Sequence, residues 1–108
     1  MDTFKGFSNK TIYTPVPNPL LGKLLQDIES LSELKCTLRV FALIHQNRSK
    51  RQWITVEELM NDLLLINGLA HEYTDTSKAI QEGILRGVQR GTFITTSDKI
   101  GDASQTLL

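Results

Sequence analysis

Helix start and stop signals in residues 54–94 constrain the fold more than any other feature, because they follow in the order helix, turn, helix and strand. Thr55 and Glu58 have the spacing of a capping box, in which each side chain accepts the backbone N–H of the other residue. A second helix is expected to begin near residues 76–77 and to end at Gly91, since glycine readily adopts the left-handed cap. The apolar positions of these helices are Val56, Leu59, Met60 and Leu63, then Ile80, Ile84 and Val88.

Two short strands flank this pair of helices in the sequence. Residues 92–96 are β-branched and aromatic, and residues 52–55 form a second such run that we expect to pair with them. Residues 97–102 have the composition of a wing tip, and residues 103–108 are expected to form the return strand. The predicted fold class is mainly α with a small β-sheet, a winged helix-turn-helix. Such modules most often bind nucleic acid or protein partners, so an enzyme is not expected.

Residues 1–18 are predicted to form an extended N-terminal arm, and residues 19–108 the winged-helix domain. Alternating prolines at positions 15, 17 and 19 hold the end of the arm extended. An arm with large apolar side chains usually lies across its own domain or a neighbouring subunit, because leaving them in water forfeits burial energy. We therefore expect a homo-oligomer. The arm residues assigned to oligomerisation are Phe4, Phe7, Ile12 and Tyr13.

The remaining helices follow from capping signals. Asn18 before Pro19 predicts the start of one helix, because asparagine caps free N–H groups and proline fits the first helical position. Ser32 is expected to start the core helix, which runs to about Gln46 and is apolar over most of its circumference. Residues 63–66 either continue the helix that follows the capping box or begin a turn.

The composition predicts one globular domain with no overall charge. The 108 residues are 40% hydrophobic, which is enough for a single core. Twelve basic and twelve acidic residues cancel, so DNA binding would require a local basic patch. Cys36 is the only cysteine, which excludes an internal disulfide and suits a reducing compartment. No apolar leader and no stretch of roughly 18 to 20 apolar residues is present, so we expect a cytoplasmic protein without a membrane partner.

A basic loop after the core helix is the first candidate surface for nucleic acid. Residues 48–51 place three positive charges in four positions, and two more could join them if the wing folds back. The alternative is an ordinary solvated loop. Trp53, next to this loop, is expected to pack in the core rather than to stack on a base. The nucleic-acid candidates here are Arg48, Lys50, Arg51, Arg90 and Lys99.

The outer face of the second helix of the pair is the other candidate. Lys78, Arg86 and Gln89 fall on the side opposite the apolar stripe, where they could meet phosphates and base edges in a major groove. Glu82 shares that face and would repel phosphate, and the alternating charges also suit a solvated helix. Leu85 on the same side slightly favours a protein partner. The surface is therefore open to either type of partner.

A small-residue stripe and the titratable residues offer little chemistry. Ala79, Gly83 and Gly87 recur every four residues, which indicates close packing against the central helix or, as the alternative, close approach of a ligand. Cys36 and His45 lie on opposite sides of one helix and cannot share a metal. No catalytic residue, metal or cofactor is expected.

Several segments resemble the N-terminal winged-helix module of bacterial DnaD-like primosome proteins, and the resemblance covers nearly the whole chain. Its most specific parts are an F-x-G-F arm, a T-P-V-P-N segment and an E-L-K-x-T-L helix, none of which is a catalytic motif. The segments are Phe4-Lys5-Gly6-Phe7, Tyr13-Thr14-Pro15-Val16-Pro17-Asn18-Pro19-Leu20, Leu31-Ser32-Glu33-Leu34-Lys35-Cys36-Thr37-Leu38 and Gly91-Thr92-Phe93.

The resemblance implies a non-catalytic module that self-associates and docks onto DNA or onto replication initiation and helicase-loading proteins. In that family DNA binding and remodelling rest largely on a separate C-terminal helical domain. This chain ends at Leu108, near the close of the wing, which makes it either an excised fragment or a shorter relative. The alternative function is a winged-helix transcriptional regulator that binds an operator as a dimer.

Overall fold

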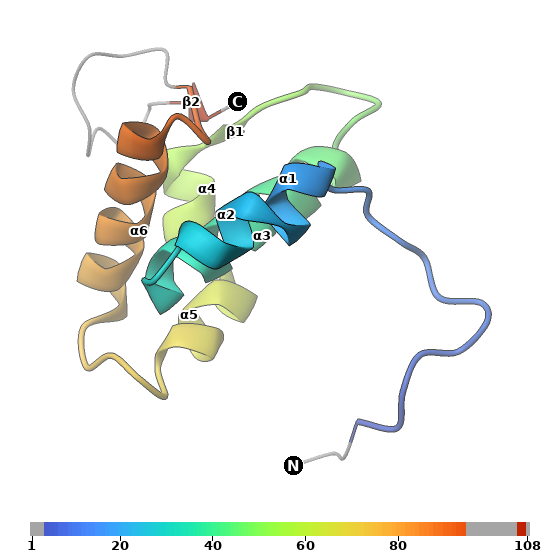
Figure 1. Ribbon diagram of the computed structural model, residues 1–108, viewed down its shortest axis with the longest axis horizontal. Coiled ribbons are helices and arrows are strands. Elements are labelled where there is room, and N and C mark those ends of the chain that lie inside the picture. Colours follow the sequence, from blue (N-terminus) through green and yellow to red (C-terminus); the bar gives the residue numbers. More distant parts are fainter. Residues whose placement is uncertain (1–3, 95–105, 108) are drawn as a thin grey trace.

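The computed structural model describes residues 4–94 and 106–107, which form a mainly helical fold with a small two-stranded sheet (Figure 1). The coarse prediction of a mainly α protein is therefore confirmed. In chain order the elements are α1 (Asn18–Leu21), α2 (Lys23–Asp27), α3 (Leu31–Gln46), β1 (Ile54–Thr55), α4 (Val56–Met60), α5 (Leu63–Leu69), α6 (Thr76–Arg90) and β2 (Thr106–Leu107).

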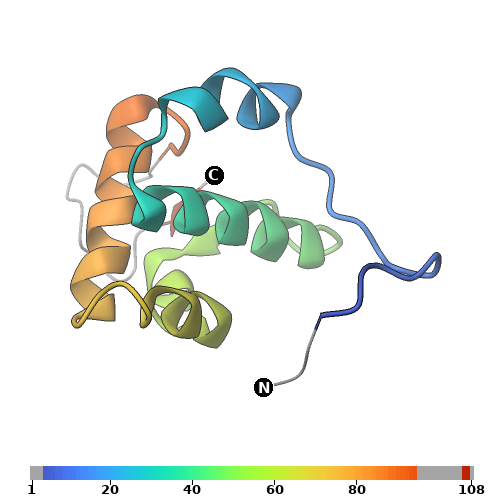
Figure 2. The ribbon, with the colours of Figure 1, turned by 60° about the horizontal axis from the view of Figure 1, so that its bottom comes forward.

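Helix α3 is the centre of the molecule. It lies between the α1–α2 segment on one side and α4 and α5 on the other, with α6 packed across it (Figure 2). Its cap is Ser30, whose hydroxyl accepts the N–H of Glu33 at 3.2 Å, so the predicted start at Ser32 was wrong by two residues. Its predicted end at Gln46 is confirmed. The buried core around it comprises Cys36, Val40, Ile54, Val56, Leu59, Leu65, Leu69, Ala79, Ile80, Ile84 and Phe93.

The segment before α3 forms two short helices, where the sequence predicted the start of one. Asn18 is already helical, and no side chain caps the start of α1. Gly22 (φ −122°, ψ −99°) separates α1 from α2, and the helical conformation ends at Asp27. Leu20 is buried, Leu21 and Leu25 are exposed, and Leu24 and Ile28 are half-buried. The leucines of this segment are therefore divided between core and surface.

The capping box at the start of α4 is confirmed. The hydroxyl of Thr55 accepts the N–H of Glu58 at 3.0 Å, and the Glu58 carboxylate accepts the N–H of Thr55 at 3.2 Å. Residues 63–66 belong to a separate helix, α5, and this outcome differs from both alternatives. The carboxylate of Asp62 accepts the N–H of Leu65 and so caps α5 independently. Leu63, expected on the buried stripe, is exposed at the first position of α5.

Helix α6 begins after Asp75, whose carboxylate caps the N–H of Lys78, and ends at Gly91 with φ of +90°. The left-handed glycine cap is confirmed. The predicted packing of the small-residue stripe against the central helix is confirmed at Gly83, whereas Gly87 packs against Phe93. A Cβ on Gly83 would lie 2.7 Å from the carbonyl oxygen of Ser32 on α3, and one on Gly87 would overlap the ring of Phe93. Small residues thus allow α6 to approach both.

The described sheet pairs β1 with β2, at residues 106–107. Ile54 pairs with Leu107 and Thr55 with Thr106 in an antiparallel ladder. The predicted pairing of residues 52–55 with 92–96 is not found over the described residues 92–94, because the N–H groups of Thr92 and Phe93 donate to the carbonyl of Gly87 and fold these residues back onto α6. The return strand predicted over residues 103–108 is confirmed at residues 106–107. Residues 95–96 and the predicted wing tip at 97–102 lie outside the described residues.

Candidate functional site

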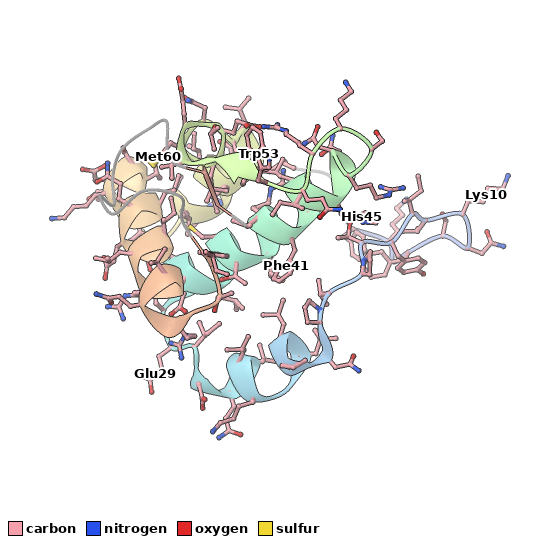
Figure 3. The ribbon with its side chains drawn as sticks, turned by 90° about the horizontal axis from the view of Figure 1, so that it is seen from above. Lys10, Glu29, Phe41, His45, Trp53 and Met60 are labelled. Atoms are coloured by element: carbon pink, nitrogen blue, oxygen red, sulfur yellow. The ribbon has the colours of Figure 1, made fainter. Side chains whose placement is uncertain are left out.

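The N-terminal arm exposes four large apolar side chains. Residues 4–17 form no helix or strand and extend away from the helical body, and Lys10 lies near the tip of this excursion (Figure 3). The rings of Phe4 and Phe7 pack edge to face, with centroids 5.0 Å apart, and this is the one aromatic pair among the described residues. The predicted oligomerisation residues are thus on one exposed segment: Phe4 71%, Phe7 76%, Ile12 92% and Tyr13 73% exposed.

The basic loop after α3 contains fewer available charges than the sequence indicates. Arg48 and Lys50 are exposed, and the guanidinium of Arg48 donates to the carbonyl of His45 at 2.8 Å. Arg51 instead makes a bidentate pair with Glu58, the glutamate of the capping box. The hydrogen bonds from Arg51 hold the pKa of Glu58 below its usual value, and those to Glu58 raise the pKa of Arg51. Arg51 therefore stabilises the start of α4.

Trp53 does not occupy the position in the core that was predicted. It is 38% exposed, outside the cluster that contains Ile54 and Phe93, and it follows the basic loop at the start of β1 (Figure 3). The guanidinium of Arg51 lies over its ring, 4.9 Å from the centroid. A cation over the face of an indole is attracted by the ring quadrupole, so Arg51 holds Trp53 at the surface.

The outer face of α6 is exposed but carries little net charge. Lys78 and Gln89 are exposed, as predicted. Arg86 donates two hydrogen bonds to the carboxylate of Glu82, at 3.0 and 3.1 Å, four residues earlier. This pair cancels one positive charge on the face that a DNA groove would meet. Lys99, the last of the predicted nucleic-acid residues, lies outside the described residues.

Arg90 is engaged in the most buried ion pair of the described structure. Its guanidinium donates to both carboxylate oxygens of Glu33 on α3, at 2.6 and 3.1 Å. The Glu33 side chain is 1% exposed and that of Arg90 is 30% exposed. The pKa of Arg90 is raised chiefly by the hydrogen bonds to Glu33, with smaller contributions from the charges of Asp27 and Glu29. The pair fixes the last turn of α6 against the first turn of α3.

A hollow between α3 and α5 was not predicted. Its walls combine an apolar floor with two basic side chains, and its volume is about 230 Å³. One signal in the sequence pointed to it: residues 63–66 are four consecutive apolar residues, and a helix cannot direct all four into one core. Leu63 and Leu64 are indeed exposed. The lining residues are Lys35, Leu38, Arg39, Leu64, Leu65 and Gly68.

The one cysteine is a buried thiol on α3. Cys36 is completely buried, and burial together with the charge of Glu33 raises the pKa of its thiol to about 12. Within residues 4–94 and 106–107, no cluster of three or more potential metal ligands occurs. No helix in that same part of the chain has the length and apolar character needed to cross a bilayer.

Comparisons of the chain with models of known protein families, with curated proteins and with solved structures found no match.

Proposed function

We propose that this chain is a non-catalytic assembly module that self-associates through its arm and docks partner proteins in a replication initiation complex of the DnaD-like type. The observation on which this rests is the arm, where Phe4, Phe7, Ile12 and Tyr13 are each more than 70% exposed. Monomeric soluble proteins rarely present so much apolar surface on one segment, and such surfaces mark interaction sites. The motifs quoted above support the family and, through it, the process.

We also propose that the fold is a winged helix. Helices α3, α4 with α5, and α6 occur in the order that this fold requires, and β1 lies between the first two. The partner of β1 comes from the end of the chain, so residues 92–105 connect the end of α6 to the strand at positions 106–107. In the topology of a winged helix, the wing lies between the recognition helix and this strand. Helix α6 then corresponds to the recognition helix.

Self-association is favoured over DNA docking because the charges of the candidate DNA surface are largely compensated within the chain. Arg51, Arg86 and Arg90 each pair with a glutamate. In contrast, the apolar arm side chains gain roughly 1.5 to 3 kcal/mol each on full burial. Even partial burial of four of them against a second copy would offset several kcal/mol of the association cost.

Size-exclusion chromatography with light scattering tests the proposal on the full chain. The double substitution F4S and F7S should shift the mass from that of an oligomer to that of a monomer. The matched control is Leu21→Ser, since Leu21 is also exposed, at 61%, but lies on α1. The control should keep the mass of the parent. A parent chain that is monomeric at all concentrations, or an oligomer that survives the double substitution, would contradict the proposal.

DNA docking is the second candidate, supported by the exposure of Arg48, Lys50 and Lys78. None of the three is within ion-pair distance of a carboxylate in the described part of the chain. Fluorescence anisotropy with short single- and double-stranded DNA should then give an affinity that falls as salt rises. Replacing these three residues by alanine should weaken binding, whereas Arg51→Ala should change it little. Equal affinity of the triple variant and the parent would exclude this candidate.

A further inference from the structure

We propose that the hollow between α3 and α5 is a docking groove for an acidic amphipathic helix of a partner protein. The inference rests on the proposed role in assembly, but it concerns a surface separate from the arm. The groove lies between two helices on the face of α3 turned toward α5, whereas Phe41 lies on the side of α3 turned toward α1 and α2 (Figure 3).

The floor of the groove is apolar and accessible. Leu64 is 67% exposed and Leu38 is 44% exposed, one from each helix, with the buried Leu65 between them and the core. Leu63, the neighbour of Leu64, is exposed as well. The volume of about 230 Å³ is smaller than the range of roughly 300 to 1,000 Å³ typical of small-molecule sites. It suits one or two side chains of a protein partner better than a cofactor.

The rim of the groove carries one uncompensated positive charge. Arg39 is neutralised by Asp62, which accepts two hydrogen bonds from it at 2.6 and 3.0 Å. Lys35 donates to the carbonyl of Gly68 at 2.7 Å, and among residues 4–94 and 106–107 no carboxylate lies within ion-pair distance of it. A neutral carbonyl leaves the ammonium charge in place next to an apolar floor. A partner that presents a leucine with a nearby carboxylate would complement both.

The same charge argues against the arm of a second copy as the occupant. The arm contains Lys5 and Lys10 beside its aromatic residues, so its insertion would bring like charges to Lys35. A two-fold contact of this face with itself would place two copies of Lys35 at one apolar patch. A helix with apolar residues at i and i+4 and flanking glutamates avoids both conflicts, and helix-in-groove docking is a recurrent recognition mode.

The probe for the experiment is a pair of synthetic helical peptides of about 15 residues, near the length at which isolated helices become stable. One has leucines on a single stripe with glutamates at its edges, and the other has lysine in place of every glutamate. In ¹⁵N NMR titrations of the full chain, the acidic peptide should shift the amide signals of Lys35, Leu38, Leu64 and Gly68. Equal binding of both peptides, or shifts confined to other surfaces, would overturn the proposal.

Single substitutions separate the contribution of the apolar floor to peptide affinity from that of the Lys35 charge. Leu64→Ser should weaken binding of the acidic peptide about tenfold or more, because much of an exposed leucine is buried on docking. Lys35→Gln should weaken binding and reduce its dependence on salt. Leu21→Ser is the matched control and should bind as the parent does. Circular dichroism checks that each variant is folded, and unchanged affinity of folded Leu64→Ser would refute the groove.

The two proposals fail in different ways. The double substitution F4S and F7S should leave peptide binding unchanged, so the groove can be measured whether or not the arm causes self-association. If Leu64→Ser instead converted an oligomer into a monomer, the occupant would be a second copy, and the acidic partner would be rejected. The acidic partner would also be rejected if a peptide with the sequence of residues 4–13 bound the groove more strongly than the acidic peptide does.

Discussion

Gly83→Ala is the sharpest test of the packing between α3 and α6. A methyl group at this position would lie 2.7 Å from the Cys36 sulfur and 2.7 Å from the Ser32 carbonyl oxygen. The carbonyl carbon of Ser32 would be 2.9 Å away. Two of these three atoms belong to the backbone of α3, so relief requires a shift of one helix against the other and not the rotation of a side chain.

Two opposing contributions determine the size of the effect. Alanine gains about 1 kcal/mol over glycine in a helix interior. Overpacking a filled core costs about 1 to 3 kcal/mol, and a contact with backbone places this site near the upper end. The net loss should therefore be about 2 kcal/mol in the free energy of unfolding, which corresponds to a fall of about 10 °C in Tm for a domain of this size.

Urea unfolding of the parent and the variant measures this loss, with the m-value expected to be unchanged. The control is Gly68→Ala in α5, where the new Cβ would be 3.6 Å from Lys35 Nζ and 3.8 Å from its Cδ, an ordinary contact. This variant should gain about 0.5 to 1 kcal/mol. A Gly83→Ala protein as stable as the parent, or more stable, would show that α6 does not pack this tightly on α3.

Three further predictions concern individual buried or paired groups. Arg90→Ala should lower the free energy of unfolding by about 3 kcal/mol, because it leaves the buried Glu33 carboxylate unpaired; a loss below about 1 kcal/mol in urea unfolding would contradict this. The hydrogen bonds from Arg51 lower the pKa of Glu58 below its ordinary value of 4.5. The stability that the ionised Glu58 contributes to the folded protein is therefore complete above pH 4.5, and it is lost as the pH falls through the pKa of Glu58 in the folded state. Glu58→Gln should therefore flatten the fall in stability between about pH 5 and pH 3, and an unaltered slope would exclude the linkage. Cys36, with a pKa of about 12, should resist a thiol reagent in the native protein at about pH 8 and react after unfolding in guanidinium, whereas rapid native labelling would disprove its burial.

Signals that act within a few residues were readable from the sequence. Thr55 and Glu58 satisfy each other's backbone groups without help from distant parts of the chain, so their spacing alone predicted the start of α4. Gly91 ends α6 because a left-handed cap favours a residue without Cβ. Ser30 shows the limit of this approach. It is one of two nearby serines with capping potential, and the sequence alone did not show which one the backbone would use.

The conformation of residues 92–93 depends on their contacts with the preceding helix, α6. Residues 92–96 have strand composition, but Phe93 is 3% exposed and packs against Gly87, where a larger residue would prevent the contact. Burial of an aromatic side chain and two hydrogen bonds to the Gly87 carbonyl outweigh the local preference for strand at positions 92–93. β-propensity could not predict this, because the glycine that receives the ring belongs to the preceding helix.

The location of the unpaired positive charges was the least predictable property, and it bears on both candidate functions. Counting basic residues gave a patch around the loop and α6, but Arg51, Arg86 and Arg90 find glutamates that are 7, 4 and 57 residues away in the sequence. Of these three pairs, only that of Arg86 with Glu82, four residues apart on α6, could be predicted from helical spacing. Each pairing neutralises a charge on the candidate DNA surface and adds rigidity to the helical body. Because Lys35 meets a neutral carbonyl instead, the positive charge beside α5 is directed at an apolar groove, where it can select a carboxylate.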